Sequence, residues 1–264
     1  MCTYLEIVKL KIPSYGVMIC VGLILSNIIG YIKVKKCDMN IYDLVILEAY
    51  TILGGFIGAK LLYIITIVDK IDFTKVKDIS YINEIMKGGF VFYGGLILGA
   101  IVCVSGGIIT GIDVKEYIEK FIFLVPFVHA FGRIGCFMAG CCYGFPYEGV
   151  FAVEFPNNSY APSGIKLFPI QIVESITLFL LFILLMYIEK NNVCSTIKAY
   201  LFIYSLSRFI LEYGRFDSCR GKYLYFSTSQ WISLIIMVVM LVVQVINKNV
   251  AFKAYTMRKK LKKR

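Results

Sequence analysis

The sequence predicts an all-α, polytopic integral membrane protein with about seven transmembrane helices. Hydrophobic residues make up 59% of the 264 residues, and the mean hydropathy is +0.76. A soluble domain of this size would be about half apolar. The apolar residues also form repeated stretches of roughly 18–22 residues with few charges, which is the length needed to cross a hydrocarbon core of ~30 Å.

Seven such stretches follow one another along the chain. They are residues 13–32, 43–68, 88–111, 118–140, 169–188, 197–214 and 229–247. Six of the last seven residues, Arg258 to Arg264, are basic, and a basic cluster beyond a final span is typical of a cytoplasmic segment on anionic lipid. A cytoplasmic C-terminus and seven spans place the N-terminus outside, and the bias of basic residues toward the inner loops agrees.

The chain is interpreted as a single domain, residues 1–264, with two appended features. Residues 141–168 are expected to form a small ordered cap on the extracytoplasmic side, because the stretch from Tyr143 to Pro169 holds four of the six prolines and alternating aromatic residues. Residues 248–264 form the basic cytoplasmic tail. The net charge of +11 comes without a nucleic-acid recognition fold, so no nucleic-acid partner is expected.

Charged residues inside the predicted spans mark the candidate site. An ionised side chain in the bilayer centre costs at least ~2.5–3.5 kcal/mol, so it faces protein or a water-filled cavity. Lys60, Arg133, Arg208 and Glu212 are such residues. Arg208 and Glu212 are four residues apart and can form a structural ion pair on one helical face. Arg215, at the end of the same helix, is interpreted as an interfacial anchor.

Arg133 lies between Gly132 and Gly135, which allow another backbone or a ligand to approach closely. A guanidinium beside such small residues suits a bidentate contact to phosphate. The alternative is a structural ion pair with Glu174 or Glu154.

Three cysteines follow Arg133 with the spacing C-x4-C-C: Cys136, Cys141 and Cys142. Structural zinc motifs usually have a second pair of cysteine or histidine ligands downstream, and this sequence lacks such a pair. A bridge between Cys136 and Cys141, or to Cys219, is an alternative in an oxidising exterior. Buried apolar thiols are the default interpretation, and a reactive thiol cluster is a further alternative. No metal and no cofactor are predicted.

Two further residue types accompany the arginine. His129, the only histidine, precedes Arg133 by four residues and therefore shares its helical face; it is a candidate general base or a hydrogen-bonded structural group. Tyr93 lies between two glycine pairs in "GGFVFYGGLILGA", and Tyr15 opens the first span in "SYGVMICVG".

Five stretches, in order, together resemble the bacterial prolipoprotein diacylglyceryl transferases. "SYGVMICVG" and "GGFVFYGGLILGA" are similar to that family's W-Y-G-x-M-x-x-x-G and G-G-x-x-x-[HY]-G-G-L-I-G segments. "HAFGRIGCFMAGCCYG" is similar to the signature G-R-[IL]-G-N-F-x-N-x-E-x-x-G. "FPIQIVES" is similar to R-H-P-S-Q-L-Y-E, and "RFILEYGR" followed by "STSQWISL" is similar to R-x-x-x-E-x-x-R and G-Q-x-x-S.

The chain departs from these motifs at several positions. Cys136 and Ala139 stand where the family has asparagines, Cys141 stands where it has glutamate, and Leu167 and Phe168 replace Arg-His. The matching motif residues are Arg133, Gly135, Gly144, Pro169, Gln171, Glu174, Arg208, Glu212, Arg215 and Gln230.

The resemblance implies transfer of the diacylglyceryl group of phosphatidylglycerol to the thiol of a lipobox cysteine in a preprolipoprotein, at the outer leaflet of the bacterial cell membrane. Glycerol phosphate would leave, and positive charge must stabilise it. The residues expected to be catalytic are Arg133, Arg215, Tyr93 and His129. Arg208 and Glu212 are expected to be structural.

Substrate contacts are expected from the remaining motif residues, and anionic lipid is expected at the basic tail. The predicted substrate-binding residues are Arg133, Tyr15, Gly94, Gly95, Gly135, Gly144, Gln171, Glu174 and Gln230. Two alternatives remain open: a paralogue that binds phospholipid but modifies another acceptor, and a small membrane transporter.

Overall fold

The computed structural model describes residues 4–7, 10–75, 77–87, 89, 91–157, 159–217 and 222–261. The chain is mostly helical and forms two compact units. One unit comprises residues 1–29 and 119–264, and the other comprises residues 30–118.

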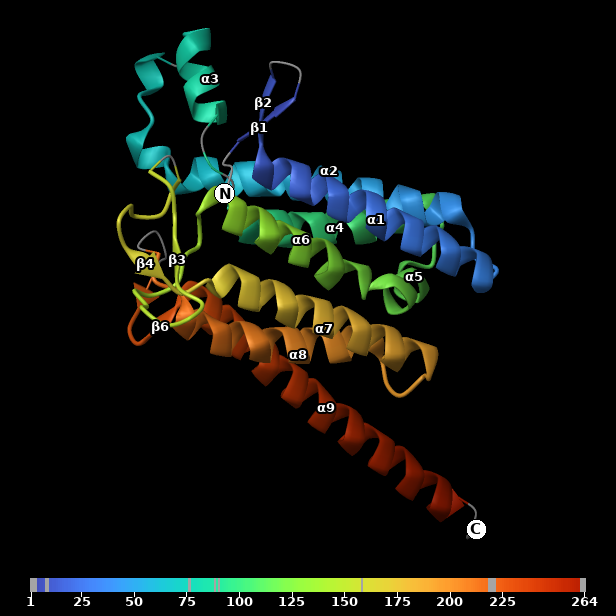
Figure 1. Cartoon of the computed structure of the whole chain (residues 1–264). Helices are drawn as coiled ribbons and strands as arrows, with labels where there is room; N and C mark the ends of the chain where they lie inside the picture. Colours follow the sequence, from blue (N-terminus) through green and yellow to red (C-terminus); the bar gives the residue numbers. More distant parts are fainter. Residues whose placement is uncertain are drawn as a thin grey trace. The chain divides into compact units, whose positions relative to one another are not determined.

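The unit of residues 1–29 and 119–264 is a helical bundle with short strands. Its helices are the first part of α1 (Ser14–Lys36), the end of α5 (Val114–Phe121), α6 (Leu124–Ala139), α7 (Ile170–Lys190), α8 (Thr196–Leu211), η3 (Glu212–Gly214) and α9 (Thr228–Leu261). Its antiparallel strand pairs are β1 (Tyr4–Ile7) with β2 (Leu10–Pro13), β3 (Val153–Glu154) with β4 (Lys166–Leu167), and β5 (Lys222–Tyr223) with β6 (Phe226–Ser227). Helix α6 packs on α7, α7 on α8, and α8 on α9 (Figure 1).

The unit of residues 30–118 is organised around two long helices. Its elements are the end of α1, α2 (Ile41–Thr66), η1 (Val68–Lys70), η2 (Phe73–Lys75), α3 (Ile79–Lys87), α4 (Phe92–Thr110) and the start of α5. Helices α2 and α4 pack at very short range through glycine residues. A Cβ on Gly58 would collide with the carbonyl oxygen of Gly94. Close approach through glycine is typical of helix pairs in membranes.

Lys60, a charged residue in the predicted second span, is buried in this unit. Its ammonium donates hydrogen bonds to the carbonyl oxygens of Ile85 (3.0 Å) and Met86 (2.8 Å) at the end of α3. It also lies over the ring of Tyr63, 4.7 Å from the centroid. Backbone oxygens at a helix C-terminus favour a cation. The contacts of the Lys60 ammonium are therefore of a structural kind.

The predicted membrane character is confirmed. Within the described residues, five helices are long and apolar enough to cross a membrane, and a sixth span arises if α5 and α6 are counted together. Helix α8 has 16 residues, fewer than the roughly 20 that a span needs. The number of seven spans and the N-out, C-in orientation stay predictions.

The fourth predicted span, residues 118–140, is not one continuous helix. It is divided between α5, which ends at Phe121, and α6, which begins at Leu124. Pro126 lies in the first turn of α6. A proline ring clashes with the carbonyl four residues earlier and lacks an N–H, so the chain begins a new helix at this point.

In the described residues 141–157 and 159–168, short strands and aromatic packing order the segment. Phe155, Ala161 and Leu167 form a buried cluster, and the rings of Phe145 and Phe168 stack at 5.3 Å. The predicted tail, residues 248–264, continues α9 as far as Leu261, and residues 262–264 lie outside the described part. The single-domain interpretation and the side of the membrane that carries the cap stay predictions.

Candidate active site

Glu174 is the central acidic group of the site. It lies in the second turn of α7 and is only 3% exposed. Its Oε1 oxygen accepts a hydrogen bond from Arg208 Nη1 at 2.6 Å, and its Oε2 oxygen lies 3.1 Å from Arg133 Nη1. One buried carboxylate therefore compensates two guanidinium groups, which come from α6 and α8.

The ion pair predicted from the spacing of Arg208 and Glu212 is present and belongs to a larger network. Arg208 Nη2 lies 2.9 Å from Glu212 Oε2, which also lies 3.9 Å from Arg215 Nη1. Arg215 donates from Nε and Nη2 to the two carboxylate oxygens of Asp217, each at 3.2 Å. The Arg215 side chain is only 7% exposed, so it belongs to the buried network and is not an interfacial anchor.

The contact between Arg133 and Glu174 has the geometry of an ion pair without a directed hydrogen bond. Within the described residues, Glu174 Oε2 accepts no hydrogen bond. A guanidinium carries five N–H donors. The donors of Arg133 are therefore not directed at Glu174, whereas Arg208 donates to Glu174 and Arg215 donates to Asp217. Glu154, the other partner considered, is exposed in β3.

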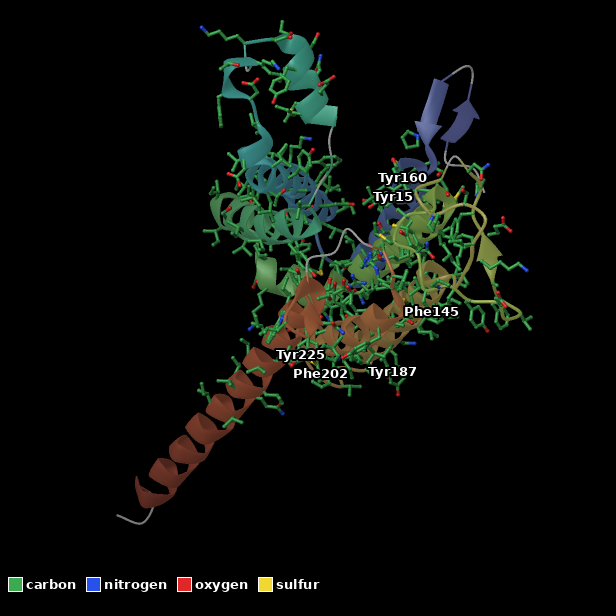
Figure 2. The ribbon with its side chains drawn as sticks, turned by 90° about the vertical axis from the view of Figure 1, so that its left-hand side faces the viewer. Tyr15, Phe145, Tyr160, Tyr187, Phe202 and Tyr225 are labelled. Carbon is green, nitrogen blue, oxygen red and sulfur yellow. The ribbon has the colours of Figure 1, made fainter. Side chains whose placement is uncertain are left out.

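Tyr15 packs on the face of α6 that carries Gly135. A Cβ on Gly135 would lie 3.0 Å from Tyr15 Cα, so the glycine allows the first turn of α1 to touch α6. The backbone N–H of Tyr160 donates to the carbonyl of Ala139 at 3.4 Å. Tyr15 and Tyr160 are both labelled in Figure 2.

The turn after α6 brings three thiols together. Gly140 has a φ of 76°, and the N–H groups of Gly140 and Cys141 donate to the carbonyls of Phe137 (3.3 Å) and Cys136 (3.1 Å). These two bonds form a Schellman motif, which brings the side chains at its two ends into contact. Those ends are Cys136 and Cys141. The sulfurs of Cys136, Cys141 and Cys142 all lie within 4.8 Å of one another.

The electrostatic environment of this turn favours a thiolate at Cys142. Hydrogen bonds from the thiols of Cys136 and Cys141, together with the positive charges of Arg215 and Arg133, hold the pKa of Cys142 far below its usual range. The hydrogen bond with Cys136 lowers the pKa of Cys141. Its hydrogen bond with Cys142 and burial outweigh that effect and raise the pKa of Cys141 to about 12. Negative charge in this cluster is therefore concentrated on one sulfur.

Gly144 and Gln171 fix the position of the turn. Gly144 forms a β-bridge with Arg215, and a Cβ on Gly144 would collide with the carbonyl oxygen of Phe168 and lie 3.1 Å from that of Gly214. The fully buried Gln171 donates from Nε2 to the carbonyl of Cys141 at 2.8 Å. Its Oε1 is buried and has no hydrogen-bond partner among the described residues.

A small cavity of about 20 Å³ lies beside the network, large enough for one water molecule. His129 and Tyr204 line it, and their ring centroids lie 5.8 Å apart. The other lining residues are Arg133, Glu174, Thr177, Leu178, Ser207, Arg208 and Leu211.

The other predicted site residues have contacts of a structural kind. Gln230 Oε1 accepts from the backbone N–H of Ser227 (2.9 Å), and Ser227 Oγ accepts from the N–H of Gln230 (3.2 Å), which is a capping box at the start of α9. Tyr93, Gly94 and Gly95 lie in α4, within the unit of residues 30–118. The two glycines face α2, and the roles predicted for these four residues stay predictions.

Sequence reasoning did not identify Asp217 or Tyr204. Tyr204 precedes Arg208 by four residues on α8, so helical periodicity could have found it. Asp217 lies outside any helix, two residues after its partner, where no spacing rule applies.

The close contact between α1 and α6 predicts the effect of one added methyl group. Gly135→Ala is expected to lower the free energy of unfolding by about 1–3 kcal/mol, because its Cβ would press on the Tyr15 backbone. Gly132→Ala is the matched control on the same helix, since the nearest atom to its Cβ is Ile19 Cγ1 at 4.0 Å. Thermal unfolding of both variants in detergent measures the difference, and equal midpoints would contradict the packing argument.

The comparisons with known proteins agree on one family. The family model for prolipoprotein diacylglyceryl transferase matches residues 3–246. A Clostridium tetani protein named phosphatidylglycerol–prolipoprotein diacylglyceryl transferase is 38% identical over 236 residues, covering 89% of this chain and 92% of that protein. The Clostridium perfringens protein named phosphatidylglycerol–prolipoprotein diacylglyceryl transferase 2 is 37% identical over 245 residues, covering 92% and 94%. With its apolar helices and its buried arginine network, the chain is a multi-pass membrane protein that belongs to the prolipoprotein diacylglyceryl transferase family.

Proposed function

We propose that this chain is a phosphatidylglycerol–prolipoprotein diacylglyceryl transferase. It would move diacylglycerol from phosphatidylglycerol to the thiol of a lipobox cysteine, forming a thioether and releasing glycerol phosphate. The names of the relatives, at 37–38% identity over most of the chain, support this reaction.

One observation in the site carries the proposal. Arg133 is a nearly buried cation whose N–H donors are not directed at its partner Glu174. A buried guanidinium with donors available in this way fits an anionic ligand, and phosphate accepts two of its N–H bonds at once. The lipid phosphate is the anionic group of the substrate.

The chemistry assigned to the arginines follows from the charge of the leaving group. When the bond between the glyceryl carbon and the phosphate oxygen breaks, that oxygen gains negative charge. Fixed cations in a site that excludes water stabilise such charge strongly. We assign this role to Arg133 and Arg215, while Arg208 holds Glu174 and Glu212 in place.

The remaining sequence-predicted residues have proposed roles around this centre. Gln171 Oε1, a buried acceptor, would receive a hydrogen bond from a hydroxyl of the lipid headgroup. Tyr15 and Gly135 would line the path of the substrate. His129 or Tyr93 would accept or orient the proton of the attacking thiol.

We further propose that the site faces the outer leaflet of the bacterial cell membrane, with residues 248–264 in the cytoplasm on anionic lipid. The basic composition of that tail supports this orientation. The prolipoprotein would present its lipobox at the outer surface.

The test uses the purified full-length protein in vesicles that contain acyl-labelled phosphatidylglycerol. A lipobox peptide is expected to gain the label as a thioether, and the same peptide with Cys→Ser is expected to gain none. Phosphatidylcholine in place of phosphatidylglycerol is the lipid control. Absence of labelled peptide from folded protein in phosphatidylglycerol vesicles would contradict the proposal.

A further inference from the structure

Cys136, Cys141 and Cys142 form a cluster that the arginine chemistry does not use. In the described part of the chain, this is the one group of three or more histidine, cysteine or acidic side chains whose ligand atoms converge within 4.8 Å. All three are free thiols, and Cys136 is buried. A disulfide would join two of the sulfurs and leave the third without a partner, so the threefold convergence suits a metal ion better.

The backbone holds the cluster in a conformation that is uncommon for its residue type. Cys142 has a φ of 57°, in the left-handed region that side chains other than those of glycine, asparagine and aspartate rarely adopt. Strained residues of this kind persist where the surroundings hold them and gather at functional sites. The surroundings here are the Schellman turn on one side and the bridge between Gly144 and Arg215 on the other.

We infer that Cys136, Cys141 and Cys142 bind one zinc ion with an open fourth position. Zinc–sulfur bonds of about 2.3 Å place tetrahedral thiolate ligands about 3.8 Å apart. The sulfurs reach that spacing from their present separation by small side-chain movements. Three protein ligands and one exchangeable position are the arrangement of catalytic zinc sites, whereas structural sites have four protein ligands.

The charges near the cluster fit this occupant. Three thiolates and one divalent cation leave a single negative charge. The guanidinium groups of Arg133 and Arg215 act electrostatically on Cys142, so they would balance that charge. Soft thiolate ligands also select zinc over hard cations such as magnesium.

The open position has a use in the reaction, and this part of the inference rests on the proposed function. The lipobox thiol would occupy the fourth site, where coordination to zinc favours its deprotonation, and its proton would pass to the acceptor proposed above, His129 or Tyr93. The thiolate would then attack the glyceryl carbon. The carbon–sulfur bond forms as the carbon–oxygen bond breaks, and glycerol phosphate leaves with the electron pair.

The first measurement is the metal content of the full-length protein, by mass spectrometry of the elements. We expect about one zinc ion per chain after zinc is added and excess is removed. Cys136→Ser, Cys141→Ser and Cys142→Ser are each expected to lose most of it. Cys103→Ser is the matched control, because Cys103 and Cys136 are both 8% exposed. Circular dichroism verifies that each variant is folded.

The second measurement tests the open position without relying on activity. Cobalt-substituted protein is expected to change its absorption spectrum when a lipobox peptide with cysteine is added, and not with the serine peptide. In the transfer assay, a chelator is expected to lower the rate about 100-fold and zinc to restore it.

The outcomes separate this inference from the proposed function. Full transfer by protein with no bound metal, in the presence of chelator, would overturn the zinc site and leave the transferase intact. A disulfide within the cluster, or equal zinc content in the cysteine variants and the wild type, would also overturn it. Stoichiometric zinc in a protein that transfers no label to the peptide would support the zinc site and contradict the proposed transferase function.

Discussion

Arg133→Ala is expected to lower kcat/KM for diacylglyceryl transfer by about 100- to 1,000-fold, the usual effect of removing one donor that stabilises charge in a transition state. The protein should still fold, because Glu174 keeps its 2.6 Å hydrogen bond with Arg208. The measurement is the rate of labelled-lipid transfer to a lipobox peptide by purified protein in vesicles.

Two further variants, one conservative and one a control, test this prediction more specifically. Arg133→Lys keeps the charge but loses the planar fork of donors, so we expect a rate between those of the wild type and the alanine variant. Lys166→Ala removes an exposed cation from β4 and should leave the rate unchanged. An Arg133→Ala enzyme with the wild-type rate would remove Arg133 from the reaction.

Glu174→Gln is expected to lower the free energy of unfolding by about 3–5 kcal/mol, because two guanidinium groups would lose the carboxylate they share in a buried site. Its side chain is 4% exposed, and those of Arg133 and Arg208 are 12% and 13% exposed, so water compensates little of the loss. Thermal unfolding in detergent, followed by circular dichroism, should show a midpoint lower by about 6 °C or more.

The control for this variant is Glu154→Gln, because Glu154 is exposed in β3. It should leave the midpoint unchanged within about 1 °C, as surface substitutions usually have small effects. Equal midpoints for the Glu174 and Glu154 variants would show that the shared ion pairs contribute no net stability.

The helices could be predicted from the sequence because their signal is local. The predicted stretches at residues 169–188 and 229–247 correspond to α7 and the first part of α9. Long apolar stretches leave the backbone one stable solution in lipid, since an α-helix satisfies its own hydrogen bonds. The division of residues 118–140 was missed, although Pro126 at the start of α6 was the available signal.

The candidate site was predicted only in part. The spacing of Arg208 and Glu212 indicated their ion pair, since residues four apart share a helical face. Glu174 was one of two candidate partners for Arg133, and no local rule separated it from Glu154. That choice depends on which helix packs against α6, and the packing of α7 on α6 decides it.

The convergence of the three thiols is a second feature that the sequence spacing did not predict. The spacing C-x4-C-C by itself suggested packed apolar thiols, because zinc motifs have a second pair downstream. The structure brings the three sulfurs together through Gly140 in the left-handed region and the Schellman bonds that follow. The local cue was Gly140, directly before Cys141, because glycine just after a helix commonly adopts the left-handed conformation that a Schellman motif requires.

By itself, the sequence determined that this is a multi-pass membrane protein of the transferase type, because hydrophobic length and motif order are properties of the chain. Only the tertiary structure decided which carboxylate holds Arg133, how Arg215 enters the buried network, and that three cysteines share one centre. These depend on contacts between segments far apart in sequence. In such contacts burial makes each unpaired charge expensive, so packing selects the partners.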